Sequence, residues 1–301
     1  MTGTVVVPLD GSTLAEEAIP LAQAIAERTG SILHLLEVVP ADSSASLQEE
    51  VRAYLRSQAR RIDDRVQISI HVGDPAEQII DGAAELLDPT VVMTTHGRSG
   101  IRRWAFGSVA ERVVHGAASP VLLIRSGLER PAVIDAILVP LDGTAYSEAA
   151  LPYATDLAQA FDAVLHIARV VETTRLYARL TPQTPGAAEA IAEVVTGLVR
   201  EARAYVERRV AGLREQGVRA EPHLLEGYAA DALIGLEREG VTDLTVMATR
   251  ARTGLSRVVF GSVAEQLLKL GTTPVMMVPP EPILEALASA DAAQPSVSAD
   301  R

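Results

Sequence analysis

The sequence contains no cysteine among its 301 residues. Disulfide bonds, zinc sites built on thiolates, a cysteine nucleophile and redox chemistry at thiols are therefore all excluded. Lysine is almost as rare, because Lys269 is the only lysine among 27 basic residues, and it does not follow a glycine. The Gly-Lys pair of a P-loop is absent, which excludes that form of phosphate binding.

Long apolar runs and an excess of positive charge are also missing. No apolar stretch approaches the roughly 18 residues that a membrane span requires. Residues 1–7 have no basic region before their apolar residues and lead directly into a strand pattern, so we expect no signal peptide. The net charge of -12 repels polyanions. We therefore expect a cytoplasmic protein whose partners include neither nucleic acid nor a membrane.

An internal repeat is the main feature that the sequence does contain. Two short motifs occur twice in the same order, each between an apolar run and a helical pattern, which indicates a duplicated domain. The first motif is Val7-Pro8-Leu9-Asp10-Gly11-Ser12, which returns as Val139-Pro140-Leu141-Asp142-Gly143-Thr144. The second is Phe106-Gly107-Ser108-Val109-Ala110-Glu111, which returns as Phe260-Gly261-Ser262-Val263-Ala264-Glu265.

The spacing between equivalent residues locates the copies and an insertion. Equivalent residues lie 132 positions apart up to Val38 and Val170, but 154 apart from Gly73 and Gly227 onward, so the second copy has 22 additional residues. They fall in a Thr/Pro-rich loop at 173–186 and in a lengthened helix at 187–216. We assign copy one to residues 1–126, copy two to residues 134–280, and a flexible C-terminal tail to residues 281–301.

Strand and helix patterns alternate through each copy. In copy one, apolar runs at 4–9, 31–39, 66–72, 90–94 and 120–124 indicate buried strands, and a helix is expected from residue 12 to residue 30. Such alternation is typical of a parallel sheet with right-handed crossovers and helices on both faces. We predict two tandem, doubly wound, Rossmann-like α/β domains, each with five parallel strands in the order 3-2-1-4-5.

Two loops of each copy lie where such a fold binds ligands. In this strand order, strands one and four are neighbours whose connections run in opposite directions, and their carboxyl ends form a crevice. The loops of copy one are Asp10-Gly11-Ser12 and residues 95–107. In the second loop Gly97 and Gly107 allow close approach of backbone amides to a phosphate, and Arg98 adds positive charge.

The helix start that follows the second loop allows another interpretation. Ser108 and Glu111 have the spacing of a capping box, in which the two side chains satisfy backbone donors of the first turn. Ser262 and Glu265 repeat that spacing in copy two. For these residues alone the capping role is favoured, whereas the complete loop together with Asp10 favours a ligand.

The remaining polar residues look structural. His34 and His166 are equivalent residues of the second strands, and the six histidines show none of the spacings typical of a metal site, so we expect no metal ligands. No arranged pair of carboxylates and no residue placed as a general base is visible. We therefore predict that the protein is not an enzyme.

The combined motifs resemble the universal stress protein family in its tandem form. The similarity covers nearly all of residues 3–125 and 135–279. It is carried by the Val-Pro-Leu-Asp-Gly-Ser start, the His-Gly-Arg-Ser-Gly loop, the Gly-Ser-Val-Ala-Glu-Arg helix start and the Ser-Pro-Val-Leu-Leu-Ile final strand. The resemblance implies a fold like that of the adenine nucleotide alpha hydrolases and a stress-response protein that binds ATP, with or without Mg²⁺.

ATP-binding members of that family carry the pattern G-x2-G-x9-G-[ST]. Copy one matches it at Gly97, Gly107 and Ser108, but has Thr94 at the first position. By resemblance, Asp10 would lie beside the adenosine and the glycine loop would hold the phosphates. The implied nucleotide-binding residues of copy one are Pro8, Asp10, Val38, Met93, Gly97, Arg98, Gly107, Ser108 and Val109.

Copy two departs further from the pattern. It keeps Gly261 and Ser262, but Ala251 stands at the middle position and Ala248 at the first. A β-carbon at the middle position disfavours positive φ and crowds a phosphate, so copy two is expected to bind nucleotide more weakly than copy one. The implied nucleotide-binding residues of copy two are Pro140, Asp142, Val170, Met247, Gly261, Ser262 and Val263.

The expected function is regulatory: the protein would sense or buffer ATP under stress, with at most slow hydrolysis. The alternative is an interaction module that binds no nucleotide and acts through dimers or partner proteins. An adenylating enzyme would require a longer serine- and glycine-rich loop than Asp10-Gly11-Ser12 provides. The two copies are expected to form an intramolecular pseudo-dimer in which the fifth strands, 120–124 and 274–278, lie at the contact. A homodimer of whole chains is a further expected assembly.

Overall fold

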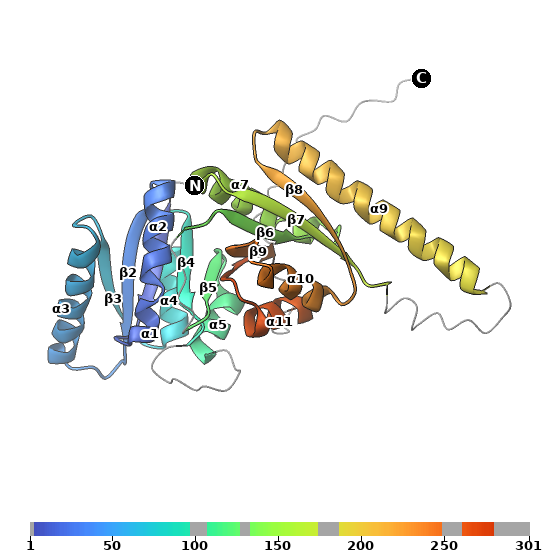
Figure 1. Cartoon of the computed structure of the whole chain (residues 1–301). Helices are drawn as coiled ribbons and strands as arrows, with labels where there is room; N and C mark the ends of the chain where they lie inside the picture. Colours follow the sequence, from blue (N-terminus) through green and yellow to red (C-terminus); the bar gives the residue numbers. More distant parts are fainter. Residues whose placement is uncertain (1–2, 97–106, 127–132, 174–186, 249–260, 280–301) are drawn as a thin grey trace, which may run out of the picture.

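The computed structural model describes residues 3–96, 107–126, 133–173, 187–248 and 261–279, and over these residues strands and helices alternate as predicted (Figure 1). Copy one comprises β1 (Thr4–Leu9), α1 (Thr13–Glu16), α2 (Ile19–Thr29), β2 (Ile32–Val39), α3 (Ala45–Ile62), β3 (Gln67–Val72), α4 (Pro75–Ala84), β4 (Pro89–Thr94), α5 (Ser108–Gly116) and β5 (Val121–Ile124). Copy two comprises β6 (Ala136–Pro140), α6 (Ala145–Glu148), α7 (Ala150–Phe161), β7 (Val164–Val171), α9 (Ala187–Glu215), β8 (Ala220–Glu226), α10 (Ala229–Arg238), β9 (Leu244–Ala248), α11 (Ser262–Leu270) and β10 (Val275–Val278).

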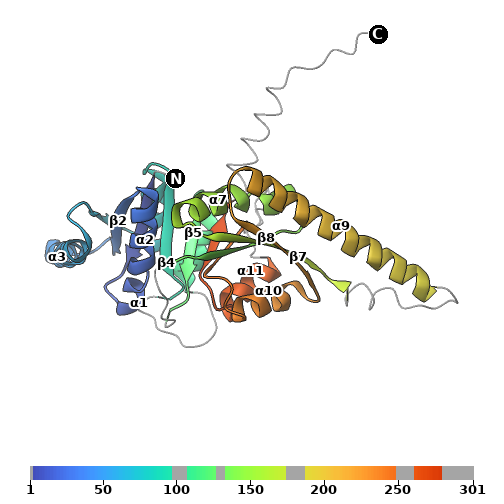
Figure 2. The ribbon, with the colours of Figure 1, turned by 45° about the horizontal axis from the view of Figure 1, so that its top comes forward.

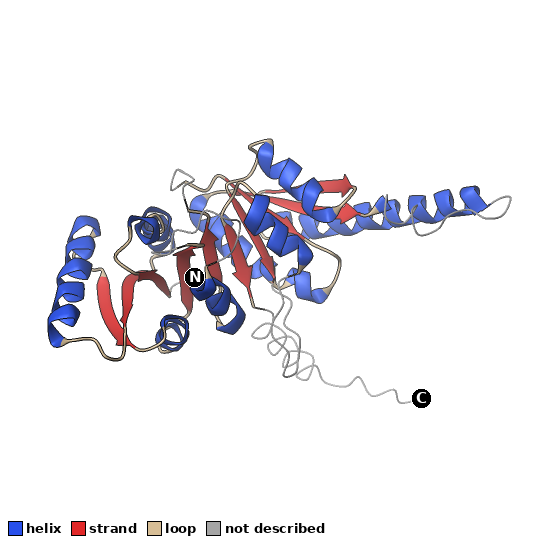
Figure 3. Ribbon diagram, turned by 90° about the horizontal axis from the view of Figure 1, so that it is seen from below, coloured by secondary structure: helices blue, strands red, loops and turns tan. Residues whose placement is uncertain are grey.

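The ten described strands form one sheet in the order β3-β2-β1-β4-β5-β10-β9-β6-β7-β8. Each copy therefore has the predicted strand order 3-2-1-4-5. Neighbouring strands within a copy run parallel, as predicted. The two five-stranded sheets are joined edge to edge, so the molecule has a continuous sheet with helices on both sides (Figure 3).

The junction between the copies is the antiparallel pairing of β5 with β10, which confirms that the fifth strands lie at the contact. Leu122 pairs with Met276, which is its own equivalent 154 residues later, and the flanking residues pair symmetrically about them. This register is the one that a two-fold axis between these two residues produces. Both side chains are fully buried. The apolar edges of the two copies therefore cover each other.

Alternate residues of each strand enter two different cores, one on each face of the sheet. On β1, Val5 and Val7 belong to a core beneath α2, α3, α7 and α9, whereas Val6 belongs to a core beneath α4, α5, α10 and α11. Burial on both faces explains why the strands read as nearly continuous apolar runs.

The helix predicted for residues 12–30 is divided in two. α1 ends at Glu16 and α2 starts at Ile19. Pro20 has no amide hydrogen, and inside a helix its ring would clash with the carbonyl of Glu16, so it lies in the first turn of a new helix instead. Gly30 ends α2 with φ 71°, the left-handed conformation that glycine adopts readily.

Part of the 22-residue insertion of copy two lengthens one helix. α9 starts at the predicted residue 187, ends one residue before the predicted 216, and has 29 residues, against 18 in the equivalent α3. It projects beyond the sheet (Figure 1, Figure 2). The predicted loop at 173–186 and the predicted tail at 281–301 lie outside the described residues, apart from Thr173.

Candidate functional site

The two repeated motifs of copy two meet at the carboxyl ends of neighbouring strands. β6 pairs with β9, so the loop after β6 lies near the start of α11, at the switch point of the strand order. A cavity of about 220 Å³ lies there. Its lining includes every copy-two residue that the sequence singled out: Pro140, Asp142, Val170, Met247, Gly261, Ser262 and Val263.

One wall of this cavity is apolar. Pro140, Val170 and Met247 come from the ends of three neighbouring strands and are partly buried. Leu233 of α10 is 2% exposed behind them, and Tyr146 at the rim is 41% exposed. Such a wall is suited to the flat face of a heteroaromatic ring.

The aspartate that follows the first strand is held by its own loop. Asp142 Oδ1 accepts hydrogen bonds from the Thr144 amide at 3.0 Å and the Thr144 hydroxyl at 2.5 Å. The turn requires Gly143 at φ 85°, a conformation that favours glycine. Asp10 makes the same two bonds with Ser12, at 3.0 and 2.5 Å. The carboxylate is therefore fixed in the same orientation in both copies.

A tyrosine of the third helix supports this loop in each copy. The Tyr205 hydroxyl donates to Glu148, in the short helix after the Asp142 loop, at 2.7 Å, and Tyr54 donates to Glu16 of copy one at 2.8 Å. Burial and the bond to Glu148 raise the pKa of Tyr205 to about 12, so the donor keeps its proton at neutral pH. The hydrogen bond from Tyr205 to Glu148 thus stabilises the Asp142 loop from outside the cavity.

The capping-box interpretation of the helix starts is wrong. Gly107 and Gly261 are the N-cap residues of α5 and α11, and Ser108 and Ser262 are the first helical residues. A glycine has no side chain that could accept hydrogen bonds from the first turn. In copy two that first turn, Gly261 to Ala264, lines the cavity. Its backbone donors and the helix dipole favour an anion there.

A charge difference between the copies lies beside the same loop. Arg169 of β7 is equivalent to Glu37 of β2, a buried carboxyl group. Arg169 lines a second cavity, of about 450 Å³, which shares Asp142 and Val170 with the first. Its guanidinium carbon lies 5.3 Å from the Tyr205 ring centroid, and its Nε and Nη1 atoms are buried without a hydrogen-bond partner among the described residues. At this position copy two therefore has a guanidinium group with hydrogen-bond donors that lack a partner among the described residues, whereas copy one has a carboxyl group.

Copy one also contributes to the cavity of copy two. Val114 and His115, near the end of α5, line it. Burial lowers the pKa of His115, and the nearby Glu111 raises it in part. Sequence reasoning missed these residues, because only the pairing of β5 with β10 brings α5 to copy two. The exchange of Glu37 for Arg169, by contrast, is visible when the two copies are aligned.

The copy-one equivalents of the residues predicted to bind nucleotide in copy two are more buried. Pro8 and Met93 are buried, Asp10 and Val38 are partly buried, and Gly107, Ser108 and Val109 again form the helix start. Thr94, at the position of the first glycine, donates its hydroxyl to the His96 carbonyl at 2.8 Å. Gly97 and Arg98 lie outside the described residues, as does Ala251 of copy two. The ranking of the two copies that rests on Ala251 stays a prediction.

The two N-cap glycines are expected to differ in tolerance to alanine. A β-carbon at Gly107 would lie 2.9 Å from the Thr95 carbonyl oxygen, whereas one at Gly261 meets no atom of the described residues within 4 Å. Gly107→Ala should therefore lower the free energy of unfolding by about 1–3 kcal/mol, and Gly261→Ala should change it by less than about 1 kcal/mol. Urea unfolding of the two variants measures this, and equal losses would contradict the close approach of residue 107 to the Thr95 carbonyl.

Fold and cavity together define a tandem, doubly wound α/β protein with a cavity at the switch point of copy two, and known proteins are similar to this chain. The profile of the universal stress protein family matches twice, at residues 1–125 and 134–279. A universal stress protein of Methanocaldococcus jannaschii is 32% identical over 143 residues, which is 47% of this chain and 80% of the relative. One of Mycolicibacterium smegmatis is 26% identical over 218 residues, covering 71% of this chain and 69% of the relative.

A solved structure supports the same fold over nearly the whole chain. The universal stress protein from Archaeoglobus fulgidus superposes with a TM-score of 0.69 at 19% identity, covering 92% of this chain and 98% of that one. The chain therefore belongs to the universal stress protein family, in tandem form. None of the helices in the described ranges is long and apolar enough to cross a membrane.

Proposed function

We propose that this protein binds an adenine nucleotide, with ATP as the main ligand, in the cavity of copy two. The observation that carries the proposal is that one cavity brings together the Asp142 loop, the apolar wall and the first turn of α11. The adenine would pack on Val170 and Met247, the ribose would lie beside Asp142, and the phosphates would accept hydrogen bonds from the backbone of Ser262 and Val263.

Charge supports this assignment for copy two in particular. The chain carries a net charge of -12, so a phosphate chain needs a local positive environment. The dipole of α11 provides one such environment and Arg169 another. Because Glu37 occupies the place of Arg169 in copy one, we propose copy two as the primary site and copy one as the secondary site, which is the reverse of the ranking predicted from Ala251.

The proposed role is regulatory binding rather than catalysis. Asp142 is the only carboxylate among the described residues that line the cavity, and one of its oxygens is held by Thr144. Such a group is poorly placed to activate a water molecule for hydrolysis. We propose a cytoplasmic ATP sensor or buffer of the stress response, in which the two copies act as an intramolecular pseudo-dimer and whole chains form a homodimer.

Isothermal titration of the full chain tests the proposal. ATP, ADP, AMP and cyclic AMP would be titrated separately, with and without Mg²⁺, at one fixed ionic strength. We expect saturable binding of ATP at one or two sites per chain. If none of the four nucleotides binds, the proposal fails and the interaction module without nucleotide becomes the better explanation.

Reversing the charge beside the Asp142 loop should weaken ATP binding. Arg169→Glu introduces the residue that copy one has at the equivalent position, and we expect an affinity loss of about tenfold at copy two, or about 1.4 kcal/mol. Arg203→Glu makes the same change of charge on an exposed position of α9 that lines neither cavity, and it should leave the affinity nearly unchanged. If the two variants weakened ATP binding equally, the effect would come from the net charge of the chain and not from the position of Arg169.

A further inference from the structure

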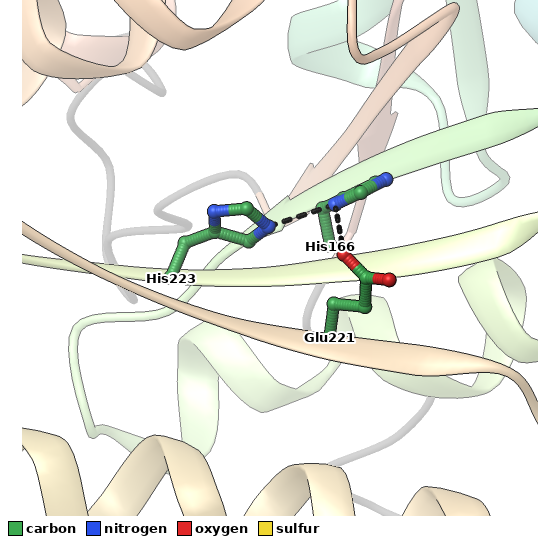
Figure 4. Close-up of side chains that lie close together, drawn as sticks. All are labelled: His166, Glu221 and His223. Carbon is green, nitrogen blue, oxygen red and sulfur yellow. Dashed lines mark hydrogen bonds and ion pairs between the residues drawn. The ribbon is translucent and has the colours of Figure 1, made fainter.

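Three side chains with metal-binding atoms converge on β7 and β8, away from the nucleotide cavity. His166 Nδ1 lies 2.8 Å from His223 Nε2 and 3.9 Å from Glu221 Oε2 (Figure 4). One ligand atom from each residue lies within 4.8 Å of the other two. His166 is near the start of β7, whereas the cavity residue Val170 is near its carboxyl end. The cluster is therefore separate from the nucleotide cavity and lies at another position on the sheet.

The sheet register explains why sequence spacing did not reveal this cluster. Glu221 and His223 are two residues apart on β8, so their side chains are on the same face of the sheet. His166 pairs directly with Glu221 across the strands. The three residues come from two neighbouring strands that a 29-residue helix separates in the sequence. His166 lies on a strand, as the sequence predicted.

The donor set fits a first-row transition metal ion. Two imidazole nitrogens and one carboxylate oxygen are ligands that Zn²⁺ accepts, with water as a fourth. Ligand atoms on a tetrahedral zinc ion are about 3.3 Å apart for bonds of about 2.0–2.1 Å. The observed separations of 2.8 and 3.9 Å lie on either side of that value, so small shifts of the side chains suffice.

The three residues differ in solvent exposure, so that an ion can reach the cluster from solution. His166 is 8% exposed, while the Glu221 side chain is 59% exposed and offers access from solvent. Burial lowers the pKa of His166, and the neighbouring His223 lowers it further, although Glu221 raises it in part. The lowered pKa favours the neutral imidazole, which is the form that ligates a metal.

Copy one contains a natural comparison for this cluster. His34 is equivalent to His166, but Gln67 and Ser69 occupy the places of Glu221 and His223. In copy one His34 Nε2 lies 2.8 Å from the Ser69 hydroxyl, which also lies 3.2 Å from His71 Nε2, so a histidine occupies this strand position without an imidazole at the place of His223. The fold does not require the His223 and Glu221 pair, and both residues add metal-binding groups.

We propose that His166, Glu221 and His223 form a binding site for a divalent transition metal ion of the Zn²⁺ type. Bound there, the ion would connect β8, which is an edge strand of the sheet, to β7. The hydrogen bond between the two rings would give way to two nitrogen-to-metal bonds, with the shared proton moving to the other nitrogen of its ring or to solvent. The ion would stabilise copy two against unfolding, because it binds the folded state alone.

Zinc titration of the full chain tests the proposal. The protein is first freed of metal by a chelator, and no nucleotide is present. His223→Ser and Glu221→Gln introduce the residues of copy one, so both variants should fold. His71→Leu, a control in copy one, replaces another histidine by the residue that copy two has at that position, Leu225. We expect one Zn²⁺ per chain for the wild type and the control, and affinity losses of at least about tenfold for the other two variants.

Thermal unfolding with and without Zn²⁺ provides a second measurement. The unfolding temperature of the wild type and of His71→Leu should rise with Zn²⁺ concentration, and that of His223→Ser should not. Matching unfolding temperatures in chelator would confirm that the variants are folded. Zinc binding that is equally tight in His223→Ser and the wild type would assign the ion to other surface groups and overturn the proposal, as would the absence of binding to the wild type.

Discussion

Replacing Gly261 by valine is expected to weaken ATP binding at copy two by at least a hundredfold, or about 2.7 kcal/mol. The backbone at Gly261 has φ -61° and ψ 145°, which any L-residue adopts, and a β-carbon there meets no atom of the part of the chain that the structure describes within 4 Å. The added methyl groups would therefore occupy the cavity and block the approach of phosphates to the first turn of α11. Titration with ATP measures the loss of one class of sites.

Two controls separate this effect from unfolding. Valine is a poorer N-cap than glycine, so the free energy of unfolding should fall by no more than about 1 kcal/mol. Gly197→Val in α9 also adds a β-carbon that meets none of the described residues within 4 Å. Gly197 is far from the cavity in sequence and absent from its lining, so this variant should leave ATP affinity unchanged. Undiminished ATP binding to a folded Gly261→Val protein would contradict the proposed position of the phosphates.

Truncating Leu122 to alanine is expected to lower the free energy of unfolding by about 2–5 kcal/mol. Leu122 is fully buried, and it pairs with Met276 at the centre of the junction between the copies. Because the junction is a single antiparallel strand pair, a void there weakens the packing of both copies at once. Urea unfolding followed by circular dichroism measures the loss.

Leu87→Ala is the matched control for the junction, because the same atoms are removed from a side chain that is 78% exposed. It should change the free energy of unfolding by less than about 0.5 kcal/mol. If Leu122→Ala proved as mild as this control, the junction would not have the buried packing described here.

The fold was predictable from the sequence because the repeat and the apolar runs are local signals. The runs indicated the strands, and their alternation with helices indicated the fold class and its order 3-2-1-4-5. The resemblance to family dimers and the apolar edge strands indicated the contact of the fifth strands, which the pairing of Leu122 with Met276 confirms. The division of the first helix at Pro20 was missed, although the residue that causes it is visible. Helical periodicity alone does not reveal such a break.

The candidate site was predictable only where its residues lie in the repeated motifs. Asp142 and Gly261 were found in this way and line one cavity. The capping roles given to the serines were wrong because the glycines precede them as N-caps. His115 and the pair of His166 with His223 were missed because each depends on which strand or helix lies alongside, and a one-dimensional pattern does not contain that information.

A crystal structure of the full chain grown with saturating ATP tests the central claim most directly. We expect electron density for the nucleotide in copy two, with the adenine against Val170 and Met247 and the phosphates within hydrogen-bonding distance of the Ser262 and Val263 amides. Nucleotide bound elsewhere on the chain, or a copy-two cavity without nucleotide in crystals whose packing leaves it accessible, would show that the proposed site is wrong.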